Sequence, residues 1–218
     1  MAAQTERLRP AERLVFFTDA VVAIAMTLLI LPLLESVGEA AREGLDTAEY
    51  LADHDGQLVA FALSFVIIAA FWRTHDRLFV HVERQDPVLL WLNVAWMFTI
   101  VWFPVATALV GALETDPVQL AIYIGTMLAS SLLMLALQLR LRHDPGLLEP
   151  QHPADPDETR SMLVACGFFA LALMIALTVP GAGFWSLLVL LLNPVVDGLL
   201  ERRRRTRDAP SGSAGASE

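Results

Sequence analysis

Residues 13–32 read RLVFFTDAVVAIAMTLLILP, an apolar run that contains one carboxylate, Asp19, and ends at Pro32. An α-helix needs about 20 predominantly apolar residues to cross a bilayer, and this run is long enough. A carboxylate inside such a span is costly unless it is paired or hydrated, so Asp19 is a candidate functional residue. The run therefore predicts a transmembrane helix with a buried polar group near its N-terminal end. Pro32 is expected to end this helix or to kink it.

Five further apolar runs predict an all-α integral membrane protein with six transmembrane helices. The expected spans are residues 14–34, 57–72, 88–113, 118–139, 162–179 and 184–200, and the second is expected to continue inward to Phe79. Of the 218 residues, 56% are hydrophobic and only 18% are charged. Soluble domains have about 45–50% apolar and about 25% charged residues, so a water-soluble enzyme domain is disfavoured.

The basic residues are all Arg, and they predict the orientation of the chain. In the six-span topology, fourteen of the fifteen fall on one side and only Arg42 falls on the other. The positive-inside rule makes the first side the cytoplasm, with both termini in it. We expect a cytoplasmic N-terminus over residues 1–12, a six-helix domain over 13–201, and a basic and then disordered tail over 202–218.

Composition and charge also bear on location and partners. The Arg-only, Ala- and Leu-rich composition suggests a bacterial source with high GC content, and hence the plasma membrane. The formal net charge of −9 argues against nucleic-acid binding. Much of the acidity lies on the outer side, where residues 35–56 contain seven acidic residues against Arg42 alone. This segment is expected to be either a simple solvated loop or an anionic vestibule that concentrates cations.

Signatures of enzymes and metal sites are absent from the sequence. There is no GxSxG, HExxH or P-loop motif. The histidines do not pair at i, i+4 with another His or with Cys, so the ligand spacing of zinc sites is missing. The five histidines of the chain are His54, His75, His81, His143 and His152. We therefore expect no catalytic residues, no metal and no cofactor, and the inner segment 142–160 is expected to be a linker.

Helical geometry divides the first span into two faces. At 100° per residue, one narrow stripe carries Arg13, Phe17, Ile24, Leu28, Leu31 and Glu35. Asp19 lies about 140° from Ile24 on this projection, so Thr18 and Asp19 point away from the stripe and need partners on neighbouring helices. An aliphatic stripe of this kind is either a lipid-facing or packing surface, or the lining of a pore.

Three short motifs resemble the transmembrane protein 175 family of potassium channels. Arg13-x-x-x-Phe17-Thr18-Asp19 is similar to the RxxxFSD signature of that family, with Thr in place of Ser. The segment FWRTH at residues 71–75 resembles its FWxxH motif, and Leu92-Asn93 with Phe103-Pro104 resembles its third span. The resemblance covers about residues 10–200 and implies a single-repeat prokaryotic member that assembles as a homotetramer in the lipid bilayer.

The resemblance implies a role for each group of residues. The first helix of each subunit would line the pore, with Ile24, Leu28 and Leu31 as the constriction and Thr27 at its edge. Glu35 and Phe17 are candidates for the pore mouths, although packing is the favoured role for Phe17. A polar network would hold the pore helix, and its members would be Arg13, Thr18, Asp19, Trp72, His75 and Asn93.

The sequence thus predicts a channel for monovalent cations that is leaky and modestly selective for K⁺. An aliphatic ring supplies no ligand to an ion, so it can act only through pore radius and dewetting. Two rivals remain open: a proton-coupled secondary transporter that uses Asp19 or His75, and a membrane scaffold that transports nothing. The apolar middle of the first span disfavours the transporter, because transporters place ionisable groups near the midplane.

Overall fold

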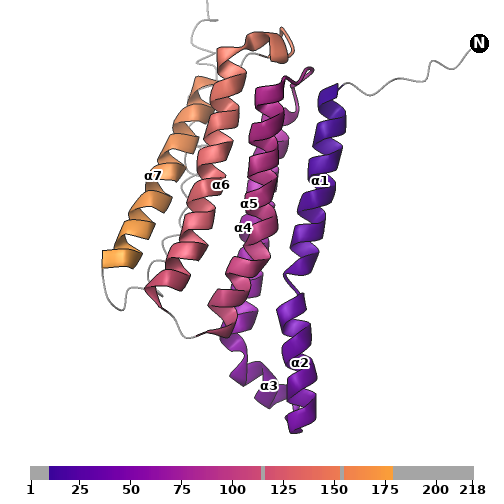
Figure 1. The fold of residues 1–218 in the computed structure, drawn as a ribbon, viewed down its shortest axis with the longest axis vertical. Coiled ribbons are helices and arrows are strands. Elements are labelled where there is room, and N and C mark those ends of the chain that lie inside the picture. Colours follow the sequence, from indigo (N-terminus) through magenta and orange to yellow (C-terminus); the bar gives the residue numbers. More distant parts are fainter. Residues whose placement is uncertain (1–9, 114–115, 153–154, 179–218) are drawn as a thin grey trace, which may run out of the picture.

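The computed structural model describes residues 10–113, 116–152 and 155–178 (Figure 1). Its long helices run side by side, and the part of the chain that it describes contains no strand beyond an isolated bridge between Val82 and Leu148. The helices are α1 (Pro10–Leu28), α2 (Leu31–Glu43), α3 (Thr47–Asp53), α4 (Asp55–Phe79), α5 (Pro87–Ala112), α6 (Pro117–His143), the short 3₁₀ helix η1 (Pro145–Leu147) and α7 (Pro156–Thr178).

Within the described ranges, five helical stretches are long and apolar enough to cross a membrane. They are α1 with α2, counted as one span of 33 residues, then α4, α5, α6 and α7. The expected continuation of the second span to Phe79 is confirmed, because α4 ends at that residue. The expected sixth span (184–200) and the tail (202–218) lie outside the described residues.

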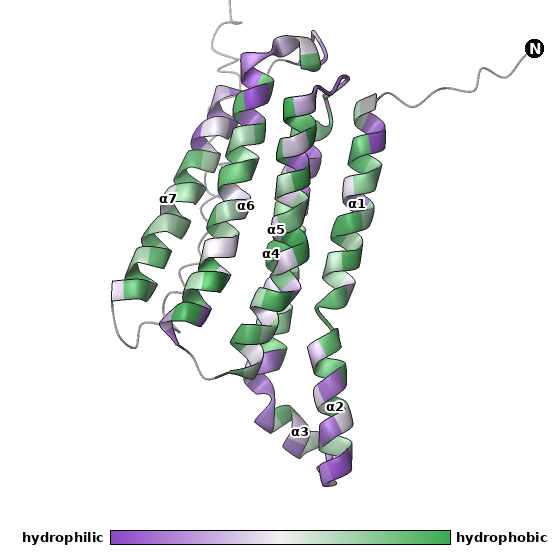
Figure 2. Ribbon diagram, in the orientation of Figure 1, coloured by the Kyte–Doolittle hydropathy of each residue, from purple (hydrophilic) through white to green (hydrophobic). Residues whose placement is uncertain are grey.

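Helix α5 lies at the centre of the packing, against α1, α4 and α6, while α7 packs on α6. Its side chains Trp96, Ile100 and Phe103 are completely buried. Hydrophobic residues predominate along the long helices (Figure 2), and many large ones among them are exposed. Because lipid is as apolar as Leu, close packing and interhelical hydrogen bonds hold such helices together, rather than the hydrophobic effect.

The first span is broken between α1 and α2, as Pro32 predicted. Pro32 has no N–H to donate to the carbonyl of Leu28, four residues earlier, and α1 ends at Leu28. The chain turns through Leu29 and Ile30 and re-enters a helix with Pro32 in its first turn. Leu28 and Leu31 therefore lie on different helices, on either side of the break.

The expectation of a loop over residues 35–56 was wrong. Helix α2 continues to Glu43 and buries Ser36 and Ala40, and Ser36 Oγ lies 3.0 Å from the hydroxyl of Tyr50 in α3. Asp46 caps α3 in a reciprocal capping box with Glu49. The acidic segment therefore lies mostly in two short helices, α2 and α3, which are seen beyond the long ones in Figure 1.

The opposite end of the bundle is tied by Asp86, which caps α5. One of its oxygens accepts from Leu89 N–H at 2.8 Å, and the other accepts from Arg140 of α6 at 2.7 and 3.1 Å. Partial desolvation would raise the pKa of Asp86, but these hydrogen bonds and the Arg140 charge outweigh it and hold the pKa below its ordinary value. The contribution of this pair to stability is therefore present at neutral pH and is lost only as the pH falls through that lowered pKa.

Candidate functional site

The first span packs one face on the described part of the chain, which leaves the opposite face uncovered. Leu14, Thr18, Val22, Ala25 and Leu29 are buried, and α1 contacts α4 and α5. The opposite stripe remains open. The exposed fractions on this stripe are 60% for Phe17, 59% for Ile24, 37% for Leu28 and 47% for Leu31, and Glu35 is exposed as well.

Thr27 lies at the edge of this open stripe. Its hydroxyl donates to the carbonyl of Ile24 at 2.7 Å. Because the hydroxyl proton is used in that bond, the lone pairs of the oxygen stay available to accept from water or to face a cation. No residue between 20 and 34 is ionisable, so the middle of the span carries no fixed charge.

A fully buried hydrogen-bonded chain joins α1, α5 and α4 on the packed face. Asn93 Nδ2 donates to Thr18 Oγ1 at 2.8 Å, and the hydroxyl of Thr18 donates to the Leu14 carbonyl at 2.8 Å. The amide oxygen of Asn93 lies 2.7 Å from His75 Nε2. Thr18, His75 and Asn93 each have an exposed fraction of 0%. These hydrogen bonds thus tie α1 to its two neighbours where water cannot compete.

His75 is held between two aromatic rings as well as by Asn93. Its ring centroid lies 4.3 Å from that of Phe79 and 4.5 Å from that of Trp96, in stacked arrangements. Its second nitrogen, Nδ1, is buried with no hydrogen-bond partner among the described residues. The stacking fixes the plane of the imidazole, and the hydrogen bond with Asn93 fixes which edge of the ring faces that residue.

A second contact joins α1 to α4 at the bundle surface. Trp72 Nε1 donates to Asp19 Oδ1 at 2.8 Å, and this hydrogen bond gives the carboxylate inside the span a partner. The structure therefore brings together five of the six residues expected in the network. The sixth, Arg13, is exposed and makes no hydrogen bond or ion pair with any residue of the described ranges.

Further buried polar contacts were not anticipated from the sequence. Ser64 of α4 lies 2.9 Å from the Tyr123 hydroxyl of α6 and accepts from Thr107 of α5 at 2.8 Å. Ser130 donates to Thr99 at 2.7 Å. Single hydroxyl residues in apolar spans carry no signal of this pairing, because they bond equally well to their own helix backbone.

Comparison with known proteins identifies relatives of the chain. Residues 13–104 match the family model described as endosomal/lysosomal potassium channel TMEM175. A Streptomyces collinus protein named a potassium channel is 28% identical over 165 residues, which cover 74% of this chain and 79% of that protein. The human endosomal/lysosomal proton channel TMEM175 is 26% identical over 147 residues, which cover 67% of this chain and only 29% of the human protein.

The fold is also that of solved channel structures. The lysosomal potassium-selective channel TMEM175 homolog from Chamaesiphon minutus matches with a TM-score of 0.66 and 24% identity, over 83% of this chain and 93% of that one. A variant of the potassium channel MtTMEM175, solved in complex with a nanobody fusion protein, matches with a TM-score of 0.60 and 19% identity, over 94% and 97%. The matched family is one of ion channels rather than enzymes, and the chain is an integral membrane protein.

Proposed function

We propose, from the match of residues 13–104 to the TMEM175 family, that the chain is a subunit of a potassium-permeable cation channel. The observation that carries this proposal is the open aliphatic stripe of Ile24, Leu28 and Leu31. The packed face of the same helix is fixed by buried hydrogen bonds, so its open face is held at one angle. A surface held in this way is suited to line a pore.

The pore would lie between subunits, because one chain supplies one copy of the stripe. A closed ring of identical subunits buries such a stripe around a common axis. We propose a homotetramer with four copies of α1 and α2 around that axis. The N- and C-termini would lie in the cytoplasm of a bacterial cell, as the distribution of Arg predicts.

The constriction would select ions without binding them. Four Ile24 side chains, followed outward by rings of Leu28 and Leu31, offer no oxygen to replace water around an ion. An ion must shed or rearrange part of its hydration shell to pass, and K⁺ holds that shell less tightly than Na⁺. The exposed oxygen of Thr27 would compensate part of this loss. The result is a modest preference for K⁺ over Na⁺.

The acidic end formed by α2 and α3 would raise the local concentration of cations. Glu35, Glu39 and Glu43 are exposed along α2, and Glu35 continues the stripe beyond Leu31. Repeated four times, these charges attract cations and repel anions at one mouth. Phe17, exposed at the other end of the stripe, would line the inner mouth.

Ion flux in liposomes tests the proposed function. Purified protein reconstituted into potassium-loaded liposomes should release K⁺ faster than protein-free liposomes, and faster than it passes Na⁺. The flux should rise steadily with ion concentration and should not require a pH gradient. Proton flux should be measured in the same vesicles, because the animal relatives are named proton channels.

The same assay separates the two rival functions. Flux that saturates with substrate and follows a pH gradient would contradict the channel and support a proton-coupled transporter. Correctly folded protein that passes no ion would support a scaffold.

A further inference from the structure

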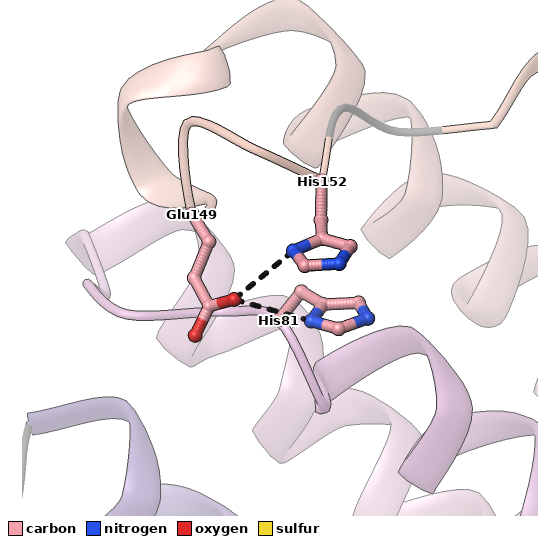
Figure 3. A group of neighbouring side chains, drawn as sticks. All are labelled: His81, Glu149 and His152. Carbon is pink, nitrogen blue, oxygen red and sulfur yellow. Dashed lines mark hydrogen bonds and ion pairs between the residues drawn. The ribbon is translucent and has the colours of Figure 1, made fainter.

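Three side chains with metal-binding atoms meet at the end of the bundle opposite α2 and α3 (Figure 3). His81 follows α4, while Glu149 and His152 belong to the connection between α6 and α7. The nitrogen and oxygen atoms that they offer all lie within 4.8 Å of one another. We propose that His81, Glu149 and His152 form a binding site for a divalent transition-metal ion of the zinc type.

The backbone that carries the three side chains is fixed before any ion binds. Glu149 N–H donates to the carbonyl of His81 at 2.9 Å, and this bond joins the two connections directly. His152 N–H donates to the carbonyl of Glu149 at 2.9 Å, which closes a turn with Pro150 in its second position. Next to the cluster, the buried residues Val82 and Leu148 pair in the isolated bridge and hold the α4–α5 and α6–α7 connections together.

The distances at the carboxylate match those within a zinc site. Glu149 Oε2 lies 3.3 Å from His81 Nδ1 and 3.2 Å from His152 Nδ1. With metal–ligand bonds of about 2.0–2.2 Å, neighbouring ligand atoms of one tetrahedral ion are roughly 3.4 Å apart. The two imidazoles are stacked, with centroids 3.8 Å apart and planes 1° apart. Tilting the exposed His152 ring would aim both nitrogens at one ion.

The donor set determines which ions fit. Two imidazoles and one carboxylate suit Zn²⁺ and its transition-metal neighbours, whereas Ca²⁺ and Mg²⁺ need mostly oxygen ligands. Both histidines are partly open to solvent, so an ion can enter and water can complete its coordination. A bound ion would join the α4–α5 connection to the α6–α7 connection, and it would stiffen that end of the subunit without touching the proposed pore.

Zinc titration of the purified, chelator-treated chain, prepared without a polyhistidine tag, tests the site by calorimetry. Wild-type protein should bind one Zn²⁺ per chain, and Zn²⁺ should raise its melting temperature. His152→Ala and Glu149→Gln should weaken binding by about tenfold or more. His152 lies at the exposed end of its turn, so His152→Ala should leave the helices intact, which circular dichroism verifies.

His143→Ala is the matched control, because His143 is an exposed histidine at the end of α6, just before the same connection, and lies outside the cluster. It should bind zinc like the wild type. The proposal is overturned if the wild type shows no saturable binding below about 1 mM. It is also overturned if His152→Ala binds like the wild type, or if His143→Ala loses as much affinity. None of these readings depends on ion flux, so they stand apart from the test of the channel.

Discussion

Replacing Ile24 with Asn should raise potassium conductance and reduce discrimination between K⁺ and Na⁺. Four amide groups at the narrowest ring would hold water that four aliphatic side chains exclude, so an ion would lose less of its hydration there. Lowering the barrier by about 1 kcal/mol increases flux by roughly fivefold. Single-channel recording in a planar bilayer gives the conductance, and the reversal potential under KCl and NaCl gives the selectivity.

Val66→Asn is the matched control for this prediction. Val66 is also a β-branched aliphatic residue and is 59% exposed, as is Ile24, but it lies on α4 away from the stripe. Its substitution should leave conductance and selectivity at their parent values. Leu28→Asn and Leu31→Asn should act in the direction of Ile24→Asn. If all three stripe variants match the parent in current and reversal potential, the pore assignment is wrong.

Replacing Asn93 with Leu should destabilise the subunit and impair the channel. The change leaves His75 Nε2 and the acceptor side of Thr18 unpaired in a site with no access to water. An unpaired buried polar group costs about 1–3 kcal/mol, less where separated helices find other partners in the bilayer. We expect a loss of about 2 kcal/mol in total, seen as a lower melting temperature in detergent, together with reduced potassium flux.

A second substitution distinguishes a lost hydrogen bond from poor packing. His75→Phe added to Asn93→Leu removes both polar partners and keeps an aromatic ring stacked between Phe79 and Trp96. The double variant should therefore be more stable than the sum of the two single changes predicts. Thr74 lies next to His75, and among the described residues its hydroxyl bonds only to the Ala70 carbonyl of its own helix, so Thr74→Ala should change stability by less than about 0.5 kcal/mol. Strict additivity of the double variant would contradict a locking role for the network.

The five spans in the described part of the chain were predictable from sequence, because the length of an apolar run is itself the signal. The acidic segment 35–56 was misjudged because its many carboxylates resemble a solvated loop. Two signals of helix were nevertheless present there. Asp46 and Glu49 have the spacing of a capping box, and Leu33, Ser36 and Ala40 recur at the helical period on the buried face of α2.

The candidate site was predictable where one helix or a known motif carries it. The stripe follows from helical geometry alone, whereas the partners of Thr18 and Asp19 came from the family resemblance. Contacts that depend on how the helices are rotated relative to one another could not be predicted from the sequence. The pairing of Ser64 with Tyr123 is one example, and the meeting of His81 with Glu149 from two separate connections is another.

A single-particle density map of the purified assembly would test directly whether Ile24 lines a pore. We expect four chains with α1 nearest the symmetry axis and the side chains of Ile24, Leu28 and Leu31 facing an axial opening. A map with α1 on the outer rim against lipid, and no opening beside these side chains, would contradict this expectation.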